Sequence, residues 1–94
     1  MTIYVDDLFS ALWTKRYAST QWCHMATDNL DLEKLHQFAE RIGLKRSWFQ
    51  THPKVPHYDI TASKRAIAIQ LGAKPVSAKE LFRLCKKELK HEQR

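Results

Sequence analysis

Apolar side chains recur at helical spacing between residues 29 and 44, and this pattern constrains the fold more than any other part of the sequence. The apolar positions follow an i, i+3, i+4, i+7 series: Leu35, Phe38, Ala39 and Ile42. Such a series predicts a helix from Asn29 to Leu44 with one buried face. Acidic residues near its start and Gly43 near its end are the residue types that stabilise those two ends.

Two further helices are predicted in the second half of the chain. The first of them begins at about Thr61 or Ser63, ends at Gly72, and would bury Ile67, Ala68 and Leu71. The second begins at a capping box, Ser77-Ala78-Lys79-Glu80, with Val76 and Leu81 placed as a hydrophobic staple. Its apolar stripe would consist of Ala78, Leu81, Phe82, Cys85 and Leu89.

Short extended segments complete the expected fold. Residues 2–5 and 21–26 are predicted strands, residues 48–50 are a third short strand, and residues 74–76 are extended. Residues 8–20 have no clean period, so we expect a loop or an irregular helix there. The fold class is therefore α/β (α+β): about three helices that cover one face of a short sheet.

The chain of 94 residues has room for one domain, 1–94, in which residues 86–94 would form a frayed, basic end of the last helix. No segment approaches the roughly 20 apolar residues that cross a bilayer, so no membrane partner is expected. The first ten residues lack a basic region followed by an apolar run, which favours a cytoplasmic location. Because so small a chain buries only about two thirds of its unfolded surface, a homodimer would enlarge its core.

Two cysteines, Cys23 and Cys85, form no CxxC pair, and we expect reduced, buried thiols. Charge is more informative, because the net charge of +6 is unevenly distributed. Residues 1–40 carry three basic and six acidic residues, whereas residues 41–94 carry thirteen basic and four acidic ones. This asymmetry predicts a positive surface that attracts phosphate or an acidic protein, and an acidic cluster that could hold a metal.

Three carboxylates and two imidazoles stand at predicted strand ends or in loops: Asp6, Asp7, His24, His57 and Asp59. In the metal hypothesis, Asp6, Asp7 and Asp59 would hold a divalent cation such as Mg²⁺ or Mn²⁺, with Zn²⁺ a further candidate. His57 or His24 would then transfer protons in a metal-dependent phosphodiesterase or nuclease. In the alternative reading, Asp6 or Asp7 caps a turn and His24 is a hydrogen-bonded strand residue.

Basic residues form a second candidate site, just beyond one predicted helix and at the start of the next. Arg46, Lys64 and Arg65 would bind phosphate, and Ser63 lies at a helix start, where free N–H groups favour an anion. Trp48 would stack on a nucleobase. The alternative places the tryptophan in the core and the lysine in water.

The segment between these two clusters adds His57, Tyr58 and Asp59 to the ligand site. Tyr58 would be a second stacking residue, and Asp59 would orient Arg65 or His57. The preferred function is therefore binding of a phosphate-bearing ligand, either a nucleotide or a nucleic acid, between the ends of the first two strands and this segment.

Two other classes of function remain open. The last two predicted helices resemble a helix-turn-helix, in which Lys79 and Arg83 would read DNA bases, although their connection is longer than the usual turn. A protein inhibitor or adaptor would instead bind a host protein through Trp13, Tyr17 and the basic C-terminal helix.

Five sequence blocks carry a resemblance to a known family: YVDD at 4–7, CHM at 23–25, LHQFAERIG at 35–43, KRSWFQ at 45–50, and HYDI with SKRA at 57–66. Together they resemble a family of short domains of unknown function found in bacteria and their phages. The resemblance implies that the polar blocks belong to a shared pattern, and so favours a common ligand site over a DNA-reading last helix. By analogy with small phage proteins, it also implies a host protein or host nucleotide as partner.

Overall fold

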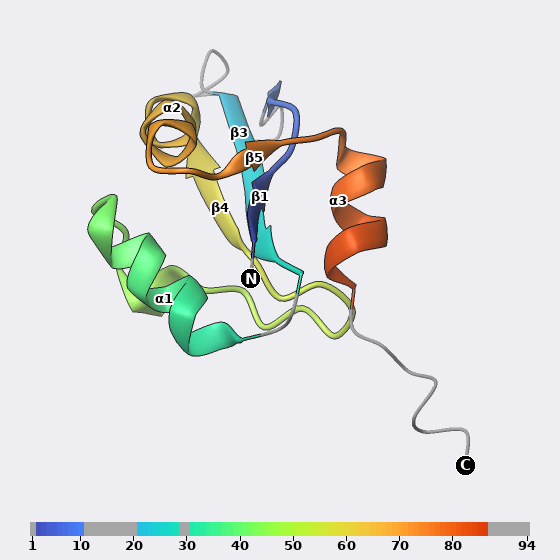
Figure 1. Cartoon of the computed structure of the whole chain (residues 1–94), viewed down its shortest axis with the longest axis horizontal. Coiled ribbons are helices and arrows are strands. Elements are labelled where there is room, and N and C mark those ends of the chain that lie inside the picture. The colour runs from blue at the N-terminus through green and yellow to red at the C-terminus, as the bar shows by residue number, and fades with distance from the viewer. Residues whose placement is uncertain (1, 11–20, 29–30, 87–94) are drawn as a thin grey trace.

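The computed structural model describes residues 2–10, 21–28 and 31–86. Along the chain it contains β1 (Ile3–Val5), β2 (Phe9–Ser10), β3 (Gln21–Thr27), α1 (Leu32–Arg41), the 3₁₀ helix η2 (Arg46–Trp48), β4 (Tyr58–Thr61), α2 (Ala62–Gln70), β5 (Lys74–Pro75) and α3 (Ala78–Cys85) (Figure 1). The expected class, a small α+β domain, is confirmed.

The longest strand, β3, lies at the centre of a five-stranded mixed sheet. Met25 is paired with Val5 of β1 and with Tyr58 of β4, so these two strands lie on opposite edges of β3. The short strand β2 pairs with the beginning of β3, and β5 extends the sheet by pairing in parallel with β1. On the other side of β3, β4 forms an edge of the sheet. Among the described residues this edge is extended by one isolated bridge, between His57 and Gln50.

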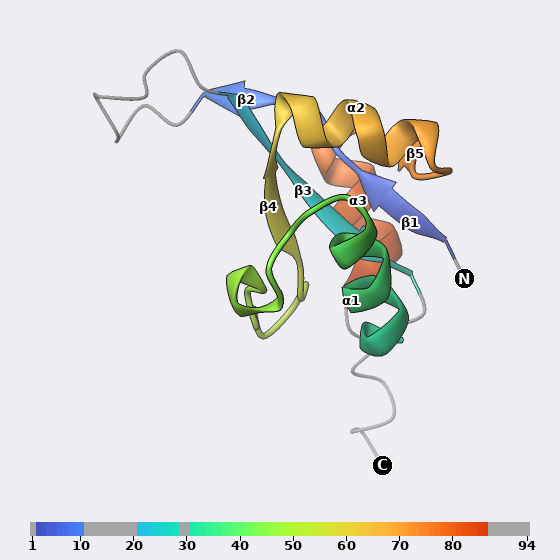
Figure 2. The same ribbon diagram turned by 90° about the vertical axis from the view of Figure 1, so that its left-hand side faces the viewer.

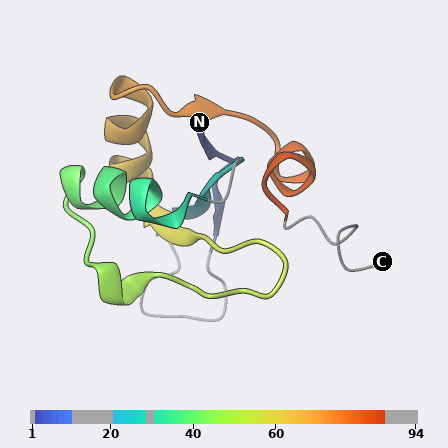
Figure 3. The ribbon, with the colours of Figure 1, turned by 60° about the horizontal axis from the view of Figure 1, so that its bottom comes forward.

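Helices cover both faces of the sheet, contrary to the expectation that they cover one. On one face of the sheet, Val5, Cys23, Met25 and Ile60 pack against α1 and α2 and form the larger core. Tyr4 and Ala26 belong to the opposite face and pack with Leu81 and Cys85 of α3. Figure 3 shows α3 separated from α1 and α2 by the strands. The difference arises because side chains alternate along a strand, and the second face has its own apolar positions.

The bounds of α2 and the start of α3 agree with the prediction, whereas α1 begins at Leu32 rather than Asn29 and α3 ends at Cys85, before Leu89. Asp31 accepts a hydrogen bond from the N–H of Lys34 at the start of α1, and Gly43 follows the helix with a φ of 89°. The side chain of Ser77 accepts the N–H of Glu80 at the start of α3. These side chains satisfy N–H groups that have no partner inside the helix.

The predicted buried face of α2 is wrong in part. Ala68 is buried as expected, but Ile67 and Leu71 are 39% and 40% exposed. The inward-facing series is instead Arg65, Ala68 and Ile69, because Arg65 donates from Nε to the main-chain oxygen of Asp6 and so fixes the rotation of the helix. The apolar residues of the sequence do not reveal this, since the residue that determines it is charged.

The predicted stripe of α3 is also confirmed only in part. Leu81 and Cys85 are buried, but Ala78 is exposed and Phe82 is 43% exposed, because only one side of this helix contacts the sheet. Leu89 and the predicted frayed end lie outside the described residues, apart from Lys86, which caps α3. The predicted strand at 48–50 is wrong. This segment begins as the end of η2, and only Gln50 forms a β-bridge.

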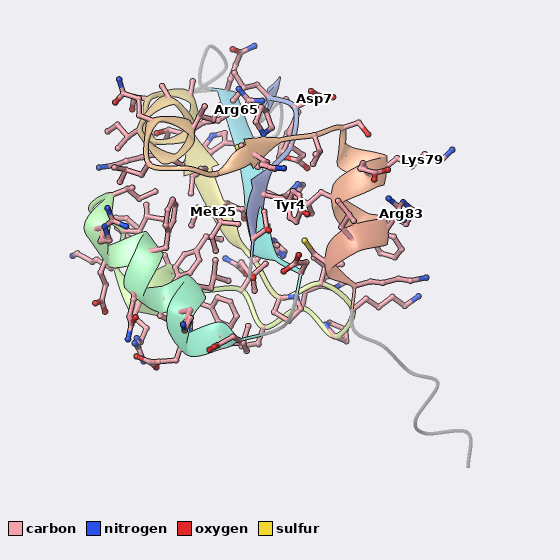
Figure 4. The ribbon with its side chains drawn as sticks, viewed as in Figure 1. Tyr4, Asp7, Met25, Arg65, Lys79 and Arg83 are labelled. Atoms are coloured by element: carbon pink, nitrogen blue, oxygen red, sulfur yellow. The ribbon has the colours of Figure 1, made fainter. Side chains whose placement is uncertain are left out.

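The arrangement of α2 and α3 contradicts a helix-turn-helix. In that motif two consecutive helices pack against each other, whereas β5 and the sheet separate α2 from α3 here (Figures 1 and 2). Lys79 and Arg83 project outward from α3 (Figure 4). The predicted contact residues Trp13 and Tyr17 lie outside the described residues. Each described helix is too short or too polar to cross a bilayer.

Candidate functional site

The side chain of Asp6 is buried at the end of β1 and holds His24 of β3 in two ways. Its Oδ1 accepts the main-chain N–H of His24 at 2.7 Å, and its Oδ2 lies 2.7 Å from His24 Nδ1. Asp6 itself is only 1% exposed. A buried carboxylate with both oxygens engaged is well satisfied, and it fixes the position and the tautomer of the imidazole ring.

The register of β3 and β4 brings Asp59 and His57 to the same place. His24 and Asp59 are directly opposite each other, so their side chains share one face at the short separation of a cross-strand pair. His57 precedes Asp59 by two residues and lies on that face as well. Asp59 Oδ1 is 3.8 Å from His24 Nε2 and 3.4 Å from His57 Nε2.

His57 is held from behind in the same manner as His24. Its Nδ1 lies 2.7 Å from the main-chain oxygen of Val55, to which it donates. The two imidazole rings meet edge to face, with centroids 4.9 Å apart. Each ring therefore has its Nδ1 hydrogen-bonded to the protein and its Nε2 turned toward the carboxylate of Asp59.

The local electrostatics favour an ionised Asp59. The neighbouring His57, and to a lesser degree His24, hold the pKa of Asp59 below its usual value despite partial burial. Burial works against a charged His57, but Asp59 and the Val55 carbonyl outweigh it, and the pKa of His57 is raised. A cation could replace the proton on Nε2 of His57, because Nε2 of His24, Nε2 of His57 and the Asp59 carboxylate converge on one point.

His24, His57 and Asp59 each offer a ligand atom, and these atoms lie within 4.8 Å of one another. Within the described part of the chain this is the group of three that could hold a metal ion, and it includes neither Asp6 nor Asp7. Asp7 is exposed on the loop after β1 (Figure 4). Two imidazoles and one carboxylate suit Zn²⁺ better than Mg²⁺, which prefers oxygen ligands.

A pocket of about 240 Å³ opens between this cluster and α3. Asp6, His24 and His57 form one wall, and Leu81 and Phe82 of α3 form the other. His52 also borders the pocket, and its Nδ1 accepts the N–H groups of Lys54 and Val55 at 3.0 and 3.2 Å. A neutral His52 therefore carries its proton on Nε2, which makes it a hydrogen-bond donor.

Arg65 does not lie beside the basic residues with which the sequence groups it. It comes from α2, on the face opposite the His24 side chain, and its Nε donates to the Asp6 main-chain oxygen at 2.8 Å. The charge of Arg65 also lowers the pKa of the Cys23 thiol, against the larger effect of burial. It therefore positions the loop that carries Asp6, and its predicted role as a phosphate ligand stays a prediction.

Three other predicted ligand residues, Arg46, Ser63 and Tyr58, lie in different parts of the fold and do not form one site. Arg46 pairs with Glu33 and Glu40 of α1. Ser63 is exposed, with its hydroxyl 3.2 Å from that of Thr61. Tyr58 is fully buried and its hydroxyl is 2.7 Å from His36 Nδ1, so the expectation that it stacks on a ligand is wrong.

Trp48 and Lys64 border a second pocket, of about 520 Å³, beside the free edge of β4. Trp22 and Asp59 also line this pocket. Asp59 therefore belongs both to the cluster with His24 and His57 and to the lining of the second pocket. Sequence reasoning did not find Trp22, His52 or the Val55 carbonyl. The alternation in β3 could have placed Trp22 and His24 on one face, but no sequence signal marks the other two.

A comparison with protein families finds one match, over residues 3–88, to the family described as "Protein of unknown function (DUF4031)". The chain belongs to this family. The resemblance to a family of unknown function is therefore confirmed, while the distribution of DUF4031 among bacteria and phages stays a prediction. Neither a search of curated proteins nor a search of solved structures finds a match.

Proposed function

We propose that this DUF4031 protein binds a divalent metal ion, Zn²⁺ in the first instance, and uses it to hydrolyse a phosphoester. The ligands are His24 Nε2, His57 Nε2 and the carboxylate of Asp59. The observation that carries the proposal is that both Nε2 atoms face one carboxylate, within 4.8 Å, while both Nδ1 atoms are hydrogen-bonded elsewhere. Metal-binding histidines in proteins have such partners behind the ring.

A site with three protein ligands leaves a coordination position for water, as hydrolytic zinc sites do. A zinc ion held by His24, His57 and Asp59 would act as a Lewis acid and would activate a bound water as the nucleophile. Hydrolysis would form one bond between phosphorus and the water oxygen, break the bond to the leaving alkoxide, and give that alkoxide a proton from solvent. Nε2 of His52 is placed to donate a hydrogen bond to a ligand in the pocket.

Two features support a phosphate-bearing substrate. The chain carries a net charge of +6, which attracts anions to its surface. The pocket beside the imidazoles is open to solvent-borne ligands, and the Nε2–H of His52 at its border is a donor that a phosphate oxygen accepts. Plain binding of a nucleotide or nucleic acid, without turnover, is the second candidate, and the basic residues favour it equally.

The test is hydrolysis of a chromogenic phosphodiester, bis(p-nitrophenyl) phosphate, by protein that has been stripped of metal and then supplied with Zn²⁺, Mn²⁺ or Mg²⁺. We expect turnover with Zn²⁺ or Mn²⁺. His57→Ala and Asp59→Asn should reduce it on the order of a hundredfold or more, because each removes a metal ligand.

His36→Gln is the matched control. It replaces a histidine whose ring packs on Phe49 and Tyr58, outside the cluster, and it retains a hydrogen-bonding side chain. This variant should keep full turnover. Equal activity of the wild type and His57→Ala, or activity that does not depend on added metal, would overturn the proposed hydrolysis. Nucleotide binding without turnover would leave the second candidate in its place.

A further inference from the structure

The pocket beside β4 has the volume and the aromatic lining of a site for a planar ring. Its volume of about 520 Å³ lies within the range of small-molecule sites. Trp22 enters it from β3 and Trp48 from η2, and Leu44 adds an apolar surface. Trp48 is 48% exposed although it is a large aromatic residue, so its ring is available to a ligand.

The main chain of β4 presents one donor and one acceptor to this pocket. The bridge between Gln50 and His57 uses the His57 N–H and C=O, so these groups point away from β3. In a strand every second residue points the same way, and therefore the N–H and C=O of Asp59 are directed to the same edge. No main-chain partner for them exists among the described residues.

Positive charge lies at the border of the pocket. Lys64 lines the pocket. Its ammonium group lies against Gly43, so a Cβ atom on residue 43 would be 2.7 Å from Lys64 Nζ. Lys45 lies with its ammonium group 5.8 Å from the centre of the Trp48 ring. A ligand that stacks on Trp48 would thus have two cations within reach of its anionic part.

We propose that this pocket binds the purine base of a nucleotide. The base stacks on Trp48 and Trp22, and its edge pairs with the N–H and C=O of Asp59. Because the Asp59 side chain lies at the metal cluster on the neighbouring surface, the nucleotide phosphate can approach the cluster. The inference rests on the proposed function in that it names the substrate class of the same site.

An extended peptide that pairs with the edge of β4 is the competing occupant. The free edge is too short for it, since Gln50 already covers His57 and α2 begins directly after Thr61. One exposed donor and one acceptor suffice for a base, whereas strand addition needs a row of them. Aromatic faces beside the edge also favour a ring, because stacking on an aromatic side chain stabilises a bound base.

The experiment measures binding of adenosine and guanosine to the metal-free protein by titration calorimetry. Nucleosides have no phosphate, so their binding does not depend on the metal cluster. We expect both purines to bind more tightly than uridine, because the larger ring stacks more extensively. Trp48→Ala should weaken purine binding about tenfold or more, and Trp48→Phe should restore part of it. Leu71→Ala, which removes an exposed apolar side chain at the end of α2, is the matched control and should change nothing.

Metal binding of the same variants separates the two proposals. Trp48→Ala should keep the Zn²⁺ affinity of the wild type, and His57→Ala should keep its purine affinity. Absence of purine binding, or equal purine affinity in Trp48→Ala and wild type, would overturn the inference even if Zn²⁺ binds. Absence of Zn²⁺ binding by the wild type, with intact purine binding, would instead overturn the proposed function alone. Binding of an extended peptide that purines do not displace would assign the pocket to the competing occupant.

Discussion

Arg65 of α2 donates from Nε to the main-chain oxygen of Asp6 at 2.8 Å, and this bond connects a helix with a loop 59 residues earlier in the chain. The same Asp6 holds His24 by its carboxylate, with 2.7 Å between Oδ2 and Nδ1. Arg65 thus supports the imidazole indirectly from the opposite face of the sheet. The candidate metal site depends on this support, because a ligand must be held in one orientation before a metal can bind tightly.

Replacement of Arg65 by methionine should therefore lower the free energy of unfolding. The variant leaves the partly buried Asp6 carbonyl without its charged donor, and we expect a loss of about 1–3 kcal/mol. Chemical denaturation measures it. Arg83→Met removes only an exposed pair with Glu80 and serves as the control, for which little change is expected. Equal stability of the two variants would show that the bond to Asp6 is unimportant.

Asp6→Asn should reduce metal affinity while the three ligands remain in place. The amide retains the shape of the carboxylate but loses its charge, so it orients and polarises His24 less well. Loss of such a partner behind a histidine ligand typically lowers metal affinity by about 10–100-fold. Competition for Zn²⁺ with a chromophoric chelator measures the change. An affinity equal to that of the wild type would contradict the role assigned to Asp6.

The His36 ring gives the fold a dependence on pH. Burial beside Phe49 and Tyr58, together with the Arg46 guanidinium, lowers the pKa of His36, and the carboxylates of Glu33 and Glu40 oppose this only weakly. Since the unfolded chain then binds the proton more readily, the contribution of neutral His36 to stability is present above the usual value of 6.5. This contribution is lost as the pH falls from 6.5 to below the lowered pKa of His36 in the folded protein.

Thermal denaturation of wild type and His36→Gln over this range checks the sign. The wild type should lose more stability than the variant between neutral and mildly acidic pH, because glutamine does not titrate. Other titrating groups affect both proteins alike, so the difference between the two curves isolates His36. A difference that is constant with pH, or that grows in favour of the wild type at acidic pH, would contradict the lowered pKa.

Both cysteines should be unreactive in the folded protein. Burial raises the pKa of Cys23 to about 12, with a further contribution from the charge of Asp6, and burial raises that of Cys85 to about 12 as well. Each side chain is at most 1% exposed. A disulfide reagent should modify neither thiol at mildly alkaline pH until a denaturant is added, when both should react. Rapid modification of the native protein would contradict this description of the core.

Local signals account for most of the fold. A helix cap such as Ser77 acts within four residues, so the sequence reveals where α3 begins. The orientation of α2 is different, because it is set by the bond between Arg65 and Asp6, whose residues are far apart in the chain. The same holds for α3, since alternation in β1 does not indicate which helix will cover Tyr4.

The candidate site was predicted in composition but not in arrangement. The sequence predicts Asp6, His24, His57 and Asp59 at strand ends or in loops. The structure gathers these four residues, but His24 lies within β3 and Asp59 within β4. Their division into ligands and supports follows from the register of β3 on β4, which places His24 opposite Asp59. Register depends on pairing between distant segments, and one sequence does not specify it. Tyr58 was misassigned for a related reason, because it alternates with Asp59 and faces the core.

The most direct test of the metal site is titration of metal-free protein with Co²⁺, a spectroscopic substitute for Zn²⁺, followed by displacement with Zn²⁺. We expect one Co²⁺ per chain, with the visible d–d absorption of a low-coordinate site. This absorption should be lost in both His57→Ala and Asp59→Asn but not in His36→Gln. X-ray absorption of the Zn²⁺ form should then show two imidazole nitrogens among the ligands. Absence of stoichiometric binding, or an unchanged spectrum in both ligand variants, would contradict the account.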